Sequence, residues 1–104
     1  MANREVTEKI NKFIASIIPE YNPRKVVLYG SYAKGTNTEN SDINIAVIVD
    51  EVEGSFIEKE ARLYKIRRGI DANIEPILVE QNNASDRSGF LDHILSYGQV
   101  LFTR

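Results

Sequence analysis

The 104-residue chain has no cysteine and no tryptophan, and it contains only three prolines and one histidine. The absence of cysteine excludes disulfide frameworks, thiolate metal sites and cysteine nucleophiles, and it fits a reducing compartment. Long hydrophobic runs are also absent, since the apolar stretches are far shorter than the ~18–20 residues that span a bilayer. The first residues, 1–5, carry an early acid and lack the apolar stretch of a signal peptide. These absences predict a soluble cytoplasmic protein.

Neither sign of charge is in large excess. The chain has 13 lysines and arginines and 15 aspartates and glutamates, for a formal net charge of −2. The overall field of such a chain does not attract nucleic acid, so nucleic-acid binding is not expected. At this length we expect one domain, residues 1–104, that buries roughly 60–70% of the surface exposed in its unfolded state. That is enough for a core without disulfides.

Helical and β-prone segments alternate along the chain. Apolar residues at helical spacing predict a first helix that ends near Pro19, a second from Ser55 to about Arg68, and a short last helix around residues 90–95. Four β-prone runs predict strands, at residues 26–29, 43–49, 74–79 and 100–102. Residues 80–88 are expected to form a polar loop. With a short helical turn at residues 31–34, this order predicts an α/β (α+β) fold: a single mixed β-sheet of about four strands with helices packed on it.

Some of these elements carry finer expectations. Residues 43–49 are apolar on both faces, which is typical of a central strand. Pro76 cannot donate a hydrogen bond to a strand ladder, so it predicts an edge strand or a bulge. Ser55 and Glu58 have the spacing of a capping box at the start of a helix. The inward face of that helix is expected to comprise Ile57, Ala61 and Tyr64.

The most informative feature is the pair Gly30-Ser31 at the end of the first predicted strand. Glycine lets the backbone approach a ligand closely, and a serine that opens a short helix can present its hydroxyl and free N–H groups to phosphate. Lys34 is either an additional cation for the phosphate or a solvated surface lysine. The segment therefore predicts a phosphate-binding turn.

Oxygen-bearing side chains follow on the next two predicted strands. Asp42 stands where the second strand begins, and residues two apart in a strand share a face, so Asp42 and Asn44 are expected to project together. Glu75 joins them if the third strand lies beside the second. Carboxylate and amide oxygens are ligands that Mg²⁺ accepts. The sequence thus predicts a magnesium site at Asp42, Asn44 and Glu75.

Four features of the chain together resemble the motif of the DNA polymerase β-like nucleotidyltransferases. They are a glycine-serine turn, an interval of ten residues, an Asp-x-Asn pair and an acid on a later strand. The short chain resembles the minimal nucleotidyltransferases (MNT) of prokaryotes over nearly its whole length. This resemblance implies that Gly30 and Ser31 bind the triphosphate, with ATP expected. It also implies that Asp42 coordinates Mg²⁺, and that Glu75 helps to bind the metal and can deprotonate the acceptor hydroxyl.

The resemblance further implies a reaction and a partner. The reaction is transfer of a nucleoside monophosphate to a hydroxyl on a partner protein or a small molecule, with release of pyrophosphate. The implied partner is a small helical HEPN-type protein, which such domains accompany as antitoxins and sometimes modify with AMP. The sequence specifies neither the acceptor nor the oligomeric state, and a homo-oligomer stays open.

Asn44 departs from the family pattern, which has a second acid at this position. An amide oxygen can still ligate a cation, but it lacks a full charge in a site that must hold metal ions against a triphosphate. On the scale of electrostatic catalysis this loss corresponds to about 10²-fold or more in rate. The alternative to an active enzyme is therefore a catalytically weakened or inactive partner subunit with the same fold.

A third hypothesis is a nucleic-acid-binding module that uses a basic cluster on the second helix. The cluster comprises Arg62, Lys65, Arg67 and Arg68. Binding through such a surface would weaken steeply with salt, but a run of this kind is more often a solvated helix face. His93, the single histidine, is expected at the surface.

Overall fold

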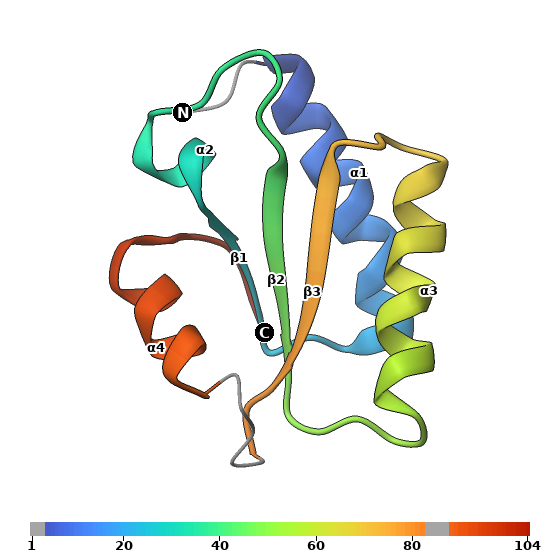
Figure 1. Cartoon of the computed structure of the whole chain (residues 1–104). Coiled ribbons are helices and arrows are strands. Elements are labelled where there is room, and N and C mark those ends of the chain that lie inside the picture. The colour runs from blue at the N-terminus through green and yellow to red at the C-terminus, as the bar shows by residue number, and fades with distance from the viewer. Residues whose placement is uncertain (1–3, 83–87) are drawn as a thin grey trace.

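The computed structural model describes residues 4–82 and 88–104, in which helices and strands alternate (Figure 1). The helices are α1 (Arg4–Tyr21), α2 (Ser31–Lys34), α3 (Phe56–Arg68) and α4 (Ser88–Tyr97). The strands are β1 (Lys25–Tyr29), β2 (Ile43–Val49), β3 (Ile74–Glu80) and β4 (Gln99–Thr103). The predicted order of elements is confirmed, while residues 83–87 of the predicted polar loop lie outside the described residues.

The strands form one mixed sheet in the order β3-β2-β1-β4. β1 is antiparallel to β2 and to β4, whereas β2 and β3 are parallel and are connected through α3. β2 is therefore central and β3 is an edge strand, as the apolar residues 43–49 and Pro76 predict. Pro76 is paired with Ile45, and its missing N–H is tolerated because an edge strand has a neighbour on one side only. The α+β fold with a four-stranded mixed sheet is confirmed.

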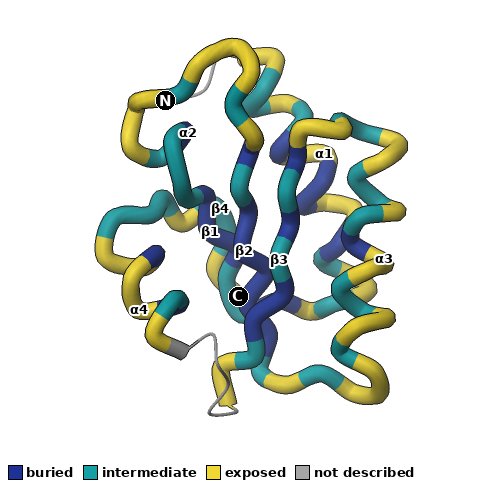
Figure 2. The backbone as a smooth tube through the Cα atoms, in the orientation of Figure 1, coloured by how far each residue is buried: buried dark blue, intermediate teal, exposed yellow. Residues whose placement is uncertain are grey.

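Helices cover both faces of the sheet, and the buried residues concentrate in its strands and on the facing helix sides (Figures 1 and 2). α1 and α3 pack on one face, where Phe13, Ile17 and Leu63 belong to the larger core cluster. α4 packs on the other face through Leu91 and Ile94. Because side chains alternate along a strand, the even-numbered residues of β2 face the α4 side. No helix among the described residues is long and apolar enough to cross a membrane.

α1 extends two residues beyond its expected end near Pro19 and stops at Tyr21. The proline removes one intrahelical N–H close to the end of the helix, where the last turn can still form. Asn22 then adopts a positive φ of 46°, and its N–H donates to the carbonyl oxygen of Ile18 at 2.9 Å. This left-handed residue is a common way to end a helix.

The ends of α3 follow the sequence signals. Ser55 is the N-cap, and its hydroxyl accepts a hydrogen bond from the N–H of Glu58 at 3.2 Å. Gly69 caps the carboxyl end, with its N–H directed to carbonyl oxygens of the last turn. The predicted start and stop of this helix are confirmed.

The predicted inward face of α3 is wrong. Ile57 is 80% exposed and Ala61 is exposed, while Tyr64 is half-buried. The helix instead buries Leu63 completely and packs Phe56 against the core. Apolar residues occur on several sides of α3, so its sequence pattern does not single out one face. The inward positions lie one residue before the predicted ones.

Candidate functional site

The predicted phosphate-binding turn connects β1 to α2. Gly30 has φ 75° and ψ −154°, a conformation essentially restricted to glycine. A Cβ atom at this position would overlap the Nδ2 atom of Asn44, so a side chain is excluded by space as well as by backbone conformation. The turn is therefore in direct contact with Asn44, and two separately predicted parts of the site are adjacent.

α2 folds tightly onto this turn. The N–H of Lys34 donates to the carbonyl oxygen of Gly30 at 3.1 Å, and the N–H of Gly35, a left-handed residue, donates to the carbonyl oxygen of Ser31. Tyr32 is buried in the core and anchors the short helix. The Ser31 side chain is half-buried, and within the described residues its hydroxyl makes no hydrogen bond, so it is uncommitted.

Tyr29, Asn44 and Glu75 form a row across three strands. Asn44 is paired with Tyr29 of β1 on one side and with Glu75 of β3 on the other. Directly paired residues project from the same face, and neighbouring strands lie about 4.8 Å apart. Asp42 is exposed, just before the first residue of β2. The structure thus brings Asn44 and Glu75 together and places Asp42 at the same end of the sheet.

Glu75 has a neighbour that the sequence does not reveal. Burial raises the pKa of Tyr64 on α3, and the nearby Glu75 carboxylate raises this pKa further through its charge and by accepting a hydrogen bond. The phenol therefore stays protonated at neutral pH and can orient the carboxylate. Tyr64 and Glu75 become neighbours only through the packing of α3 against β3, which leaves no local sequence signal.

The donor set at this end of the sheet is compatible with magnesium. The side chains of Asp42 and Asn44 make no hydrogen bond or ion pair within residues 4–82 and 88–104. In the same residues, no group of three or more Asp, Glu, His or Cys side chains is arranged to hold a metal ion. The predicted trio has only two carboxylates, with the Asn44 amide as third oxygen donor. Mg²⁺ is usually bound through one or two carboxylates and keeps several waters, so the residues present fit this ion.

Lys34 and the basic cluster have mostly internal partners. The Lys34 ammonium lies 4.7 Å from the centroid of the Tyr97 ring. Arg62 pairs with Glu20 at 3.3 Å, and the Arg67 guanidinium lies 5.0 Å from the centroid of the Tyr64 ring. The other two members of the cluster are exposed. Arg62 and Arg67 therefore have partners within the chain, although Arg62 is exposed as well. The nucleic-acid hypothesis stays a prediction.

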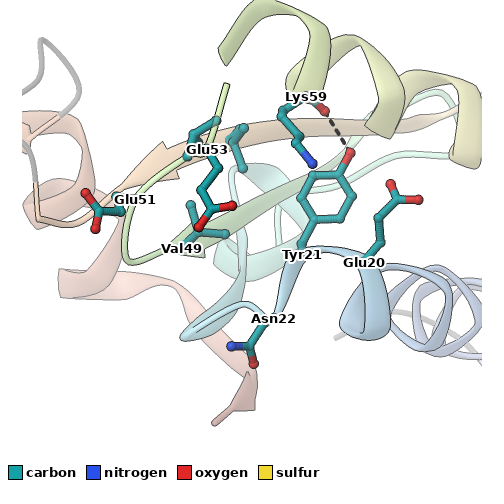
Figure 3. Close-up of a pocket in the computed structure, with 9 residues that line it drawn as sticks. Glu20, Tyr21, Asn22, Val49, Glu51, Glu53 and Lys59 are labelled. Atoms are coloured by element: carbon teal, nitrogen blue, oxygen red, sulfur yellow. Dashed lines mark hydrogen bonds between the residues drawn. The ribbon is translucent and has the colours of Figure 1, made fainter. Parts of the chain in front are cut away.

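A pocket of about 250 Å³ lies at the other end of the sheet, beyond the carboxyl end of β2 (Figure 3). Glu51, Glu53 and Lys59 line it together with Tyr21. The Tyr21 hydroxyl donates to the carbonyl oxygen of Lys59 at 2.7 Å, and burial raises the pKa of Tyr21 to about 12. None of the predicted site residues lines this pocket. The uncommitted polar groups, rather than this pocket, therefore indicate the candidate site.

The strand order, together with a glycine turn that contacts a row of metal-compatible side chains, defines a nucleotidyltransferase fold. Solved structures share this fold, among them two toxin-antitoxin structures. A toxin-antitoxin crystal structure with AMP-PNP has a TM-score of 0.60 and 26% identity over 98% of this chain and 75% of its own. A mutant of the toxin-antitoxin MntA-HpeT has a TM-score of 0.63 and 25% identity over 100% of this chain and 75% of its own.

Sequence comparisons agree with this fold. The model of the family described as "Polymerase beta, Nucleotidyltransferase" matches residues 8–104. A relative from Methanocaldococcus jannaschii, named "Putative protein adenylyltransferase MJ0141", is 31% identical over 98 residues, which cover 90% of this chain and 93% of the relative. The chain belongs to the polymerase beta nucleotidyltransferase family.

Proposed function

We propose that this protein binds ATP with Mg²⁺ and transfers AMP to a hydroxyl group of a partner protein. The observation that carries the proposal is the contact between the Gly30 turn and Asn44, with Glu75 paired directly beside Asn44. The similarity to a relative named for protein adenylyl transfer supports this choice of reaction. The similarity to a toxin-antitoxin solved with AMP-PNP supports ATP as the nucleotide and an antitoxin role beside a partner protein. The proposal of a small helical HEPN-type partner rests on the family resemblance of the sequence alone.

In this proposal, the turn holds the triphosphate and the strand residues act at the α-phosphorus. The Ser31 hydroxyl donates a hydrogen bond to a phosphate oxygen. Asp42, Asn44 and Glu75 would hold Mg²⁺, which when bound neutralises phosphate charge. The acceptor oxygen forms a bond to the α-phosphorus, its proton passes to Glu75, and the bond to the bridging oxygen breaks as pyrophosphate leaves. The Tyr64 phenol lies near Glu75 and can orient the carboxylate.

A second candidate function follows from Asn44. With an amide in place of the family's second acid, the protein would retain nucleotide binding and partner binding without turnover. The presence of only two carboxylates in the predicted trio favours this alternative. Both candidates use the same turn, so they differ in chemistry and not in where the nucleotide lies.

Transfer of radiolabel from α-labelled ATP to a purified HEPN-type partner separates the two candidates. The active protein is expected to label the partner in the presence of Mg²⁺, whereas Asp42→Ala abolishes the label. Glu53→Ala, at the opposite end of the sheet, is the matched control and should behave as the unchanged protein. Label that appears only in Asn44→Asp would establish the second candidate. Absence of label in every variant, including Asn44→Asp, would contradict transfer to this class of partner.

A further inference from the structure

The last residue of α4, Tyr97, reaches the predicted phosphate-binding turn. The N–H of Gly30 donates to the Tyr97 hydroxyl at 3.0 Å, although 67 positions separate the two residues in sequence. Tyr97 is half-buried. Tyr97 of α4 thus holds the backbone of the turn at Gly30.

The same side chain also contacts the other end of α2. The Lys34 ammonium lies over the Tyr97 ring, 4.7 Å from its centroid, a distance at which a cation is attracted to the face of an aromatic ring. Tyr97 therefore contacts both Gly30, directly before α2, and Lys34, the last residue of α2. These are two of the three residues predicted to bind the nucleotide.

Gly98 explains how the fold holds Tyr97 in this place. Its N–H donates to the carbonyl oxygen of Ile94 at 2.6 Å. A Cβ atom at Gly98 would lie 2.7 Å from a methyl carbon of Val27 and 3.0 Å from the carbonyl oxygen of Leu28. The end of α4 therefore packs against the backbone of β1 at a separation that only glycine allows. This close approach brings Tyr97 next to the end of β1, where Gly30 lies.

We propose that Tyr97 is the positioning residue of the nucleotide site. Its hydroxyl holds the Gly30 turn in the conformation that receives the triphosphate, and its ring holds the Lys34 ammonium beside that turn. The inference rests on the proposed nucleotide binding at Gly30 and Ser31, and it adds a residue from outside the family motif. Tyr97 acts through the turn and through Lys34, and it does not need to touch the nucleotide.

Binding of AMP-PNP with Mg²⁺, measured by titration calorimetry, tests this role. Tyr97→Phe keeps the ring over Lys34 but removes the acceptor for the Gly30 N–H, and we expect its dissociation constant to rise about 3- to 10-fold. Tyr97→Leu also removes the ring and is expected to weaken binding further. In the Tyr97→Leu background, Lys34→Met should have much less effect than in the unchanged protein, because the lysine is no longer held.

The chain offers a matched control at the opposite end of the sheet. Tyr21 also has its hydroxyl bonded to a backbone atom, at 2.7 Å, and a lysine ammonium over its ring, that of Lys59 at 5.9 Å. Tyr21→Phe and Lys59→Met therefore remove the same kinds of contact far from the turn. They should leave the dissociation constant of AMP-PNP unchanged. If a general loss of stability weakened binding in the Tyr97 variants, these control variants would weaken it as well.

The outcomes distinguish this inference from the proposed function on which it rests. If Ser31→Ala weakens nucleotide binding while Tyr97→Phe binds as tightly as the unchanged protein, the role of Tyr97 is wrong and the proposed site stands. If the unchanged protein does not bind AMP-PNP, or if Ser31→Ala has no effect, both are wrong. Should Tyr97→Leu fail to fold, Tyr97→Phe alone decides, with the amide signal of Gly30 in NMR spectra reporting the lost hydrogen bond.

Discussion

Asn44 has nearly the shape of aspartate but lacks its charge. It lies against Gly30 and beside Glu75, so a carboxylate at this position would add a negative charge to the proposed nucleotide and metal site. We expect Asn44→Asp to raise the rate of AMP transfer by about 10²-fold, the scale on which a charge in the site acts. Label transfer to the proposed partner protein measures this rate. A rate that is unchanged or lower in Asn44→Asp would show that the amide is not what limits catalysis.

Gly30 and Gly54 form a matched pair at the residue scale, since both have a positive φ, 75° and 83°. A Cβ at Gly54 meets nothing within 4 Å, whereas a Cβ at Gly30 overlaps the Asn44 side chain. We expect Gly54→Ala to lower the free energy of unfolding by about 1 kcal/mol through backbone strain alone. Gly30→Ala should cost about 1–3 kcal/mol more because of the overlap and because its ψ of −154° belongs to a region essentially restricted to glycine. It should also abolish nucleotide binding.

Urea denaturation of the two glycine variants measures this difference. Adding Asn44→Ala to Gly30→Ala removes the overlapping side chain and is expected to restore part of the lost stability. Equal losses in Gly30→Ala and Gly54→Ala would contradict the close contact between the turn and β2.

At the scale of an element, α4 contains one glycine, Gly89, and a second, Gly98, directly follows its last residue. Their substitutions have opposite expected effects. Gly89 is exposed and a Cβ there meets nothing within 4 Å, so Gly89→Ala should raise the free energy of unfolding by about 0.5–1 kcal/mol through helix propensity. Gly98→Ala should lower it by about 1–3 kcal/mol, because the end of α4 must move away from β1. Thermal or urea unfolding of both variants checks the signs. A neutral Gly98→Ala would mean that α4 is not held closely against β1.

Elements were predictable where a local physical rule decides them. Pro76 indicated the edge strand because a missing N–H is a property of the residue itself, and Ser55 indicated a helix start for the same kind of reason. The inward face of α3 was not predictable, because its apolar residues occur on several sides and only the packed sheet selects Leu63. Local chemistry therefore gave the boundaries of elements better than it gave their orientation.

At the scale of the whole molecule, Asp50 joins segments that are distant in sequence. Its two carboxylate oxygens lie 2.7 Å from Nε of Arg24 and 2.7 Å from Nη2 of Arg104. The hydrogen bond from Arg104 and then that from Arg24 hold the pKa of Asp50 below its ordinary value of 3.8. A carboxylate with a lowered pKa in the folded state contributes stability above its unfolded pKa, and this contribution is lost as the pH falls through the folded pKa.

We therefore expect Asp50→Asn to lower the free energy of unfolding at neutral pH and to have little effect well below pH 3.8. Urea denaturation at neutral and at strongly acidic pH measures this difference. Asp92→Asn, an exposed change on α4, is the control. An equal loss at both pH values would show that the charge of Asp50 is not what stabilises the junction.

The candidate site itself was predictable only in part. Gly30, Ser31, Asp42 and Asn44 lie close together in sequence, so their spacing could be recognised. The pairing of Glu75 with Asn44 needed β3 to lie beside β2, which the sequence could only suggest. The contact of Tyr97 with Gly30 depends on the packing of the whole α4 layer and had no local signal.

The central claim is that Gly30, Ser31 and Asp42 form one magnesium-dependent nucleotide site, and calorimetric titration with AMP-PNP tests it most directly. The unchanged protein is expected to bind AMP-PNP in the presence of Mg²⁺ and to bind it at least about 10-fold more weakly after Mg²⁺ is removed or in Asp42→Ala. No binding by the unchanged protein, or binding that neither Mg²⁺ removal nor Asp42→Ala alters, would contradict the claim.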